Sequence, residues 1–238
     1  MTSILETDTV HFTCKDGYNM PAYLARPEGG GQFPGILFIY EAFGMNSEMA
    51  RVADTFAQEG FSVLMPDLFS RGGWFSCIRQ LMTDLKNEKG RGLDDLLSAR
   101  EYLTKHKSVD PKQTAVIGLC MGGGFALILS KTGLFQVAAP FYGQVPRSLK
   151  GACPIVGSYG DRDGVTKKDL TRLQEEVATN NIPSDIKIYP GAGHSFMNDA
   201  PNIFISMLGR ILPSHAVHLP AVEDDARKRV TDFIRAHS

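Results

Sequence analysis

The sequence predicts one α/β domain over residues 1–238, with a mostly parallel central sheet that is flanked by helices and begins with an antiparallel hairpin. Two observations predict this class. Short apolar runs of strand length alternate along the chain with longer amphipathic runs, which favours helices between parallel strands. In addition, 238 residues suffice for a full hydrophobic core, and no internal repeat, low-complexity tract or linker marks a second domain. We therefore expect a sheet of about seven or eight strands.

The N-terminal segment favours a hairpin at the edge of this sheet. Residues 4–14 and 18–25 alternate polar and apolar side chains, and the Asp16-Gly17 pair between them is a strong turn signal. The first uninterrupted apolar run follows at residues 35–40 and is typical of a strand that is buried on both faces. It predicts the first central parallel strand.

The other predicted elements follow from the same patterns. In chain order they are a helix from Asn46 or Ser47 to about residue 59, a strand over 61–67, a helical stretch over 76–107 with a break near 87–90, a strand over 114–117, a helix that starts at Met121, strands over 135–142 and 153–159, a helix over 166–180, a strand over 184–189 and an amphipathic closing helix over 222–236. Residues 109–111 are expected to close the long helical stretch. Residues 202–220 hold a short apolar stretch between prolines, whose role the pattern does not reveal.

The charge pattern argues for a small-molecule substrate. The net charge is −1 and neither sign clusters, which argues against binding to nucleic acid or to an anionic membrane surface. The N-terminus lacks the basic start and apolar core of a signal peptide, and no apolar run approaches the roughly 18 residues of a membrane span. We expect a cytoplasmic protein, and the sequence indicates no oligomeric state.

The four cysteines are scattered and form no C-x-x-C pair. This spacing argues against a zinc site and against a disulfide framework, and we expect no metal and no organic cofactor. In a reducing compartment all four would be free thiols. They are Cys14, Cys77, Cys120 and Cys153.

Cys120 is the cysteine with an activating local context. It stands in a Gly-x-Cys-x-Gly turn between the predicted strand over 114–117 and the predicted helix from Met121, the form of a nucleophile elbow. A helix N-terminus favours the thiolate and offers an oxyanion donor. The alternatives are a buried cysteine in a turn that serves packing, or a phosphate-binding loop. The phosphate alternative is disfavoured because the stretch fits neither G-x-G-x-x-G nor a P-loop.

Two further residues complete a possible triad with Cys120. His194 follows the last predicted strand, and Asp163 follows the strand before it, so both can reach the same edge of the sheet. The chain order nucleophile, acid, histidine is that of the α/β-hydrolases. Asp161 is a rival acid, and either aspartate could instead satisfy backbone N–H groups of a turn. The remaining histidines are expected to be ordinary surface or core residues: His11, His106, His215, His218 and His237.

Glu41 comes directly after the strand over 35–40. The carboxyl end of a buried parallel strand is where open α/β sheets bind ligands, although a solvated loop glutamate is an equally ordinary interpretation.

Over nearly its whole length the chain resembles the dienelactone hydrolase family of α/β-hydrolases. Three motifs carry the resemblance: the cysteine elbow over 118–123, the glutamate motif over 40–44, and the acid and histidine motifs over 160–163 and 193–194. The resemblance implies Cys120 as nucleophile with His194 and Asp163. It further implies Glu41 as a neighbour of the resting thiol that exchanges partners with it when substrate arrives. It also implies an oxyanion hole formed by the N–H groups of Met121 and Ala42.

One departure from the family concerns the substrate. The family's enzymes of chlorocatechol breakdown carry an arginine four residues after the histidine, and here that position is Asn198. The departure removes a strong carboxylate anchor. Arg71, Arg79 or Arg91 could supply another anchor, and Trp74 stands in the same strand-exit loop as Arg71. We expect Arg71, Trp74 and Asn198 to border the substrate site.

The sequence thus predicts a cysteine-dependent hydrolase of a small ester, lactone or thioester. Two alternatives from other classes are a non-catalytic relative that binds a small molecule or a partner protein, and a protein whose Cys120 reacts with oxidants or electrophiles.

Overall fold

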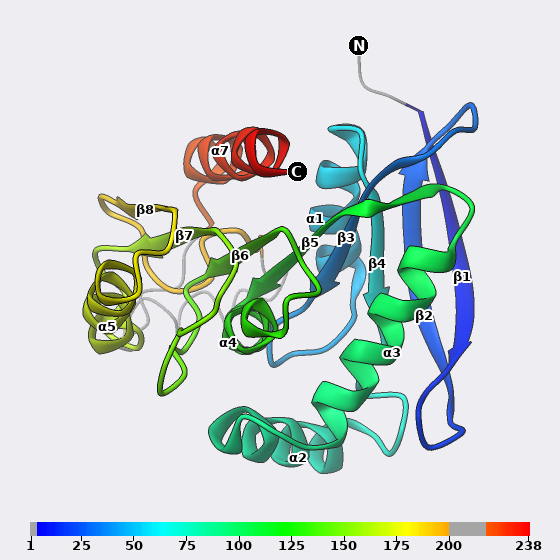
Figure 1. The fold of residues 1–238 in the computed structure, drawn as a ribbon, viewed down its shortest axis with the longest axis horizontal. Coiled ribbons are helices and arrows are strands. Elements are labelled where there is room, and N and C mark those ends of the chain that lie inside the picture. The colour runs from blue at the N-terminus through cyan, green and yellow to red at the C-terminus, as the bar shows by residue number, and fades with distance from the viewer. Residues whose placement is uncertain (1–3, 200–217) are drawn as a thin grey trace.

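Eight strands form one sheet in the computed structural model, which describes residues 4–199 and 218–238. The strand order is β1-β2-β4-β3-β5-β6-β7-β8 (Figure 1). The strands are β1 (Leu5–Thr13), β2 (Asn19–Pro27), β3 (Phe33–Ile39), β4 (Ser62–Pro66), β5 (Val109–Leu119), β6 (Val137–Phe141), β7 (Ile155–Gly160) and β8 (Ser184–Tyr189). β2 pairs antiparallel with β1 and β4, and all other pairs are parallel. The predicted class, a mostly parallel sheet with an N-terminal antiparallel hairpin, is confirmed.

Helices cover both faces of the sheet. The chain contacts place α1 and α7 against one face, and α3 and α4 against the other, where α2 packs on both of them (Figure 1). The helices are α1 (Ser47–Gln58), α2 (Trp74–Asn87), α3 (Arg91–Lys105), α4 (Met121–Leu129), the 3₁₀ turn η1 (Ser130–Thr132), α5 (Lys167–Thr179) and α7 (Pro220–His237). Of the described helices, none has the length and apolar character needed to cross a membrane.

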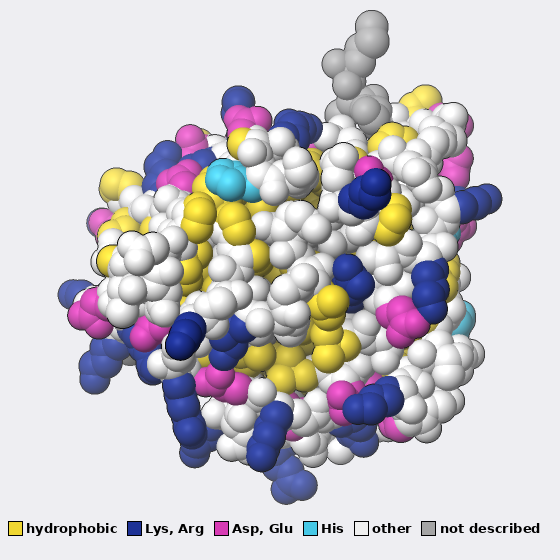
Figure 2. Space-filling model, in the orientation of Figure 1, with side chains coloured by type: hydrophobic (Ala, Val, Ile, Leu, Met, Phe, Trp, Pro, Cys, Tyr) yellow, Lys and Arg dark blue, Asp and Glu magenta, His cyan; other side chains and the backbone are white. Residues whose placement is uncertain are grey.

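The core lies between these layers and explains the apolar runs of the sequence. Every residue of β4, β6 and β7 is buried, as are the last five of β3 and the last six of β5. Strands enclosed on both faces need apolar side chains on both faces, which removes the alternation seen in the hairpin. On the surface, cationic and anionic side chains are interspersed over the face in Figure 2.

Most predicted boundaries agree with the structure, and the caps explain where two helices begin and end. Asn46, one of the two predicted caps of α1, accepts a hydrogen bond from the N–H of Met49. The predicted break near 87–90 separates α2 from α3, and Glu88 adopts the left-handed conformation that ends α2. Buried Asp84 accepts a hydrogen bond from the N–H of Gly92 at 2.8 Å and so fixes the angle between the two helices.

One boundary prediction is wrong. Residues 109–111 are not a helix-closing turn, because Val109 and Asp110 already pair with β3. The register of β5 against β3 shifts between Pro34 and Gly35, so residues 111–113 are skipped before the ladder resumes at Thr114. The proline in this stretch suggested a turn, but at the start of a strand a proline is compatible with pairing. The apolar stretch that the sequence shows within residues 202–220 runs from 203 to 212 and lies outside the described residues.

Candidate active site

The backbone at Cys120 turns sharply between β5 and α4. Its φ of 53° and ψ of −113° are strained for a residue with a side chain, and such strain clusters at functional sites. The turn is possible because its flanking residues have no side chain. A Cβ atom on Gly118 would lie 2.0 Å from the carbonyl oxygen of Gly122. The turn therefore holds the Cys120 side chain above the carboxyl edge of the sheet, as a nucleophile elbow does.

The same turn brings the end of β3 against the first turn of α4. A Cβ atom on Gly122 would lie 2.1 Å from the carbonyl oxygen of Ile39, so the two backbones are in direct contact. Glu41 and Ala42 follow β3 at this point. Within the part of the chain that the structure describes, the N–H groups of Ala42 and Met121 have no hydrogen-bond partner. Two free N–H groups beside a nucleophile can stabilise an oxyanion.

His194 and Asp163 come together in the loops that follow β8 and β7. His194 Nδ1 lies 2.8 Å from Asp163 Oδ2. Asp163 is buried, and its carboxylate also accepts hydrogen bonds from the N–H of Val165 and from the hydroxyl of Thr166. Asp161 instead accepts the N–H of Gly191 at 2.7 Å. The geometry therefore favours Asp163 over Asp161 as the partner of His194.

The electrostatics of His194 connect it with both neighbours. Burial is the largest single influence and opposes the imidazolium, but the hydrogen bonds and charges of Asp163 and Cys120 outweigh it and raise the pKa of His194 to about 10. Burial also opposes ionisation of Asp163, yet its bonds to His194 and Thr166 hold the pKa of Asp163 below the usual value. An imidazolium held between a carboxylate and a thiol is suited to stabilise the thiolate.

Glu41 is enclosed beside this pair, with 1% of its surface exposed. Its carboxylate accepts hydrogen bonds from the hydroxyl of Ser195 at 3.2 Å and from the side-chain amide of Asn198 at 2.5 Å. Burial raises the pKa of Glu41, and these two donors and the charge of His194 oppose the shift. Among the described residues, no hydrogen bond joins Glu41 to Cys120.

Tyr142 is a site residue that the sequence did not reveal. It follows β6 with a φ of 40° and is completely buried. Its ring lies 4.9 Å from that of His194 and 5.1 Å from that of Phe196, so it supports the histidine from one side. Its hydroxyl is buried without a hydrogen-bond partner among the described residues, and both Glu41 and Cys120 raise its pKa beyond the effect of burial. A left-handed tyrosine followed by Gly143 has no recognisable sequence signature.

Comparison with known proteins identifies the family of this chain. A model of the dienelactone hydrolase family matches residues 20–238. The chain belongs to this family. Similar members are a carboxymethylenebutenolidase of Rhodococcus opacus, 29% identical over 74% of this chain and 75% of its own, and a putative carboxymethylenebutenolidase of Saccharolobus solfataricus, 26% identical over 94% and 96%.

Solved structures share the fold of this dienelactone hydrolase family member. A dienelactone hydrolase-like promiscuous phosphotriesterase from metagenomic libraries superimposes with a TM-score of 0.82 at 20% identity, covering 98% of both chains. A putative dienelactone hydrolase of Klebsiella pneumoniae superimposes with a TM-score of 0.77 at 20% identity, covering 98% of this chain and 99% of that one. The predicted α/β-hydrolase fold is confirmed.

The three residues expected to border the substrate differ in their surroundings. Arg71 donates hydrogen bonds to Asp16 and Asp95 at 2.7 to 2.9 Å and leaves only 9% of its side chain exposed. This guanidinium holds the hairpin turn to α3. Trp74 donates from Nε1 to the carbonyl oxygen of Ala42 at 2.9 Å, directly beside the expected oxyanion hole. Asn198 directs its amide to the carboxylate of Glu41.

Replacing Asp163 by asparagine tests the electrostatic role of this carboxylate. We expect the pKa of His194 to fall from about 10 to its ordinary value of about 6.5 or below, because burial then acts with less opposition. In the wild type, the folded protein keeps a proton between about pH 6.5 and pH 10 that the unfolded chain has released. The free energy of unfolding should therefore decrease as the pH rises through this window.

Nitrogen-15 NMR titration of the histidine rings measures the pKa, and urea unfolding at a series of pH values measures the stability. Asp161→Asn is the matched control, since it removes a carboxylate two residues away that accepts a backbone N–H rather than the imidazole. A pKa of His194 that is equal in the two variants would contradict the assignment of Asp163.

Proposed function

We propose that this chain hydrolyses small carboxylic esters or lactones through an acyl-enzyme on Cys120. One observation carries the proposal: a cysteine on a strained elbow and a buried Asp163–His194 pair share one edge of the sheet, with the thiol and the imidazole electrostatically coupled. Membership of the dienelactone hydrolase family and the names of the carboxymethylenebutenolidase relatives support this reaction class.

The acylation half of the reaction uses the imidazolium–thiolate pair. The Cys120 thiolate attacks the carbonyl carbon of the ester, and the electron pair of the C=O bond moves onto oxygen. The free N–H groups of Met121 and Ala42 stabilise this oxyanion. When the tetrahedral intermediate collapses, the C–O bond to the leaving group breaks and His194 transfers its proton to the departing alkoxide. In a lactone, the leaving hydroxyl stays attached to the acyl group.

In deacylation, His194 acts as a base and Cys120 is the leaving group. Neutral His194 takes a proton from water, the hydroxide attacks the thioester, and the Cys120 thiolate leaves as the acid product is released. Asp163 keeps Nδ1 of His194 occupied throughout, so that Nε2 is the atom that exchanges protons with the thiol, the leaving group and water.

The side chains beside the site favour uncharged substrates. Asn198 is turned toward Glu41 and Arg71 is occupied by two aspartates, so neither is free to bind a substrate carboxylate. Trp74, which is bonded to the carbonyl oxygen of Ala42, is 43% exposed, and Phe43, which follows Ala42 in the chain, is 57% exposed. Exposed aromatic rings beside an oxyanion hole favour an apolar acyl or alcohol group. The proposed substrate class is therefore a neutral ester or lactone with an apolar substituent.

Mass spectrometry of the intact protein tests the proposal. On rapid mixing with p-nitrophenyl acetate, we expect one acetyl group per chain, located on Cys120 by peptide mapping, and a burst of p-nitrophenol that precedes steady turnover. Cys153 is an internal control, because burial raises the pKa of its thiol to about 12 and keeps it unreactive.

Two other results would redirect the assignment. A folded protein that neither forms an adduct nor turns over any member of a panel of esters and lactones, dienelactone included, would favour a binding role. An adduct that forms with peroxide or an alkylating agent but never with an ester would favour a redox or electrophile-reactive role.

A further inference from the structure

A cavity outside the catalytic site lies where α2, α4, α5 and the loop after β6 meet. It is lined by Leu85 and Lys86 on α2, Ile128 on α4, residues 144–147 of the loop and Arg172 on α5, and we call it the Arg172 cavity. Its volume is about 250 Å³, slightly below the range of about 300 to 1,000 Å³ that is usual for sites of drug-sized ligands. It therefore suits a small ligand.

The Arg172 cavity is separate from the elbow. Cys120 precedes the first turn of α4 and Ile128 is in the last turn, so this helix of 9 residues places them about 12 Å apart along its axis. None of the residues of the proposed triad lines the cavity. A ligand bound there would be distinct from a substrate on Cys120.

The walls of the cavity are apolar. Leu85, Ile128 and Val145 line it and are buried. A Cβ atom on Gly124 would lie 2.8 Å from Leu85 Cδ1, so α2 and α4 are in close contact at this wall. Among the described residues that line the cavity, none is aromatic, which argues against a nucleobase as ligand. An alkyl chain gains free energy by leaving water for such walls.

Three cationic side chains border the same cavity, namely Lys86, Arg147 and Arg172. In the part of the chain that the structure describes, none of the three forms an ion pair with a carboxylate. Lys86 is in the last turn of α2, where the helix dipole favours a cation with or without a ligand. Arg147 lies in a loop and Arg172 within α5, so no helix end accounts for these two charges. In Figure 2, cationic side chains border an apolar strip in the region between α2 and α5.

The carboxylates near the cavity have other partners. Glu88 accepts a hydrogen bond from the N–H of Arg147 at 2.7 Å and pairs with Lys131 at 2.7 Å. Asp169 accepts the N–H of Val145 at 2.8 Å. These carboxylates hold the backbone of the loop and leave the two guanidinium groups without an anionic partner.

The guanidinium of Arg172 is nevertheless held in place. Its Nη2 donates a hydrogen bond to the carbonyl oxygen of Arg147 at 2.5 Å, which ties α5 to the loop. A guanidinium has five N–H donors in a planar fork, so donors remain for a ligand. Carboxylates and phosphates are the groups that this fork binds with two parallel hydrogen bonds.

We propose that the Arg172 cavity binds a small amphipathic anion, with an apolar chain against the inner walls and a carboxylate or phosphate head group on Arg147 and Arg172. The apolar walls and the unpaired cations at one cavity are both accounted for by a ligand of this kind. The site goes beyond the proposed hydrolysis and does not depend on it, because Cys120 takes no part in the binding.

Titration of the full-length, methyl-labelled protein with sodium octanoate, followed by NMR, tests the proposal. We expect saturable shifts of the methyl signals of Leu85, Ile128 and Val145, without a shift of the His194 ring signals. Acetate has the charge without the chain, and 1-octanol has the chain without the charge. Both should bind at least about tenfold more weakly than octanoate. Octyl phosphate in place of octanoate then shows which head group the site prefers.

Two variants test the head-group contacts. Arg147→Gln and Arg172→Gln should each raise the dissociation constant of octanoate by about tenfold, because each removes a charged donor. Arg147 is exposed, so Arg147→Gln carries the test if the loss of the bond between α5 and the loop destabilises Arg172→Gln. Arg79→Gln is the matched control, since Arg79 is an exposed arginine on α2 that does not line the cavity. It should leave the dissociation constant within about twofold of the wild type.

Three results would overturn the proposal. The first is octanoate that shifts the signals of His194 and Trp74 but not those of the cavity methyl groups, which would place it in the catalytic site. The second is 1-octanol that binds as tightly as octanoate, and the third is unchanged octanoate binding in Arg147→Gln and Arg172→Gln. None of these measurements uses an ester, so the proposed function and the Arg172 cavity can each fail without the other.

Discussion

Replacing Cys120 by alanine should lower kcat/KM for p-nitrophenyl acetate by at least about 10⁴-fold, because the remaining groups bind and polarise the ester but cannot form the acyl-enzyme. The loss should appear mainly in kcat, since the thiol acts on the reacting carbon rather than on binding. The fold should survive, because the side chain is only partly buried and alanine removes one atom from it. Steady-state kinetics of variants with matched circular dichroism spectra measure the effect.

Cys153→Ala is the control for this substitution. Cys153 is also a half-buried free cysteine, but it lies outside the elbow and burial raises the pKa of its thiol to about 12. We expect its kcat/KM to stay within about twofold of the wild type. Residual activity in Cys120→Ala close to that of Cys153→Ala would place the chemistry on another residue, and the acyl-enzyme mechanism would have to be abandoned.

The fold could be predicted because its signals are local. Buried parallel strands need apolar side chains on both faces, and this requirement produced readable runs for β3, β4, β6 and β7. The start of β5 could not be predicted, because Val109 and Asp110 pair with β3 only through a register shift three residues long. Strand pairing across an irregularity depends on the partner strand, so the residues at the start of β5 do not by themselves indicate that they pair with β3.

The site was predictable where chemistry depends on chain order and not where it depends on side-chain direction. Cys120, Asp163 and His194 each follow a strand, so the topology alone brings them to one edge of the sheet. The choice between Asp161 and Asp163 needed coordinates, because residues two apart in a turn can face opposite ways.

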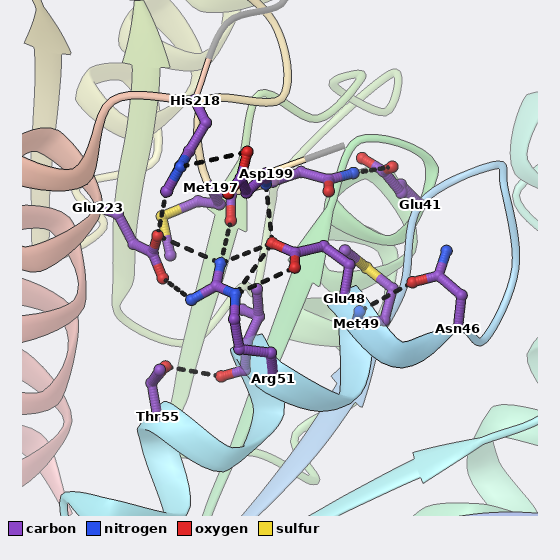
Figure 3. A network of polar contacts seen from close by, with 12 residues as sticks. Glu41, Asn46, Glu48, Met49, Arg51, Thr55, Met197, Asp199, His218 and Glu223 are labelled. Carbon is purple, nitrogen blue, oxygen red and sulfur yellow. Dashed lines mark hydrogen bonds and ion pairs between the residues drawn. The ribbon is translucent and has the colours of Figure 1, made fainter. Parts of the chain in front are cut away.

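Side-chain direction also decides the roles of the residues around the triad, and it could not be predicted from chain order. Arg71 looked like a substrate anchor, yet Asp16 and Asp95 from distant parts of the chain occupy it. Long-range ion pairs of this kind leave no trace in local sequence. For the same reason, no local pattern indicated that Arg51 donates a hydrogen bond to the carbonyl oxygen of Met197, the residue before Asn198 (Figure 3).

Gly122 should be among the least replaceable residues of the elbow. Gly122→Ala places a Cβ atom 2.1 Å from the carbonyl oxygen of Ile39 and 2.8 Å from that of Tyr40. Both obstacles are backbone at the end of a central buried strand, which cannot move without disturbing the sheet. We expect the free energy of unfolding to decrease by about 4 kcal/mol or more, measured by urea denaturation.

Gly72→Ala is the matched control, because its Cβ atom would meet nothing closer than Ser76 Oγ at 3.6 Å and should change the stability by about 0.5 kcal/mol or less. Any Gly122→Ala protein that folds should also lose activity, since separating β3 from α4 moves the N–H of Ala42 away from that of Met121 and opens the expected oxyanion hole. If Gly122→Ala were as stable and active as Gly72→Ala, the close contact between β3 and the elbow could not be what assembles this site. The expected oxyanion hole would then need another explanation.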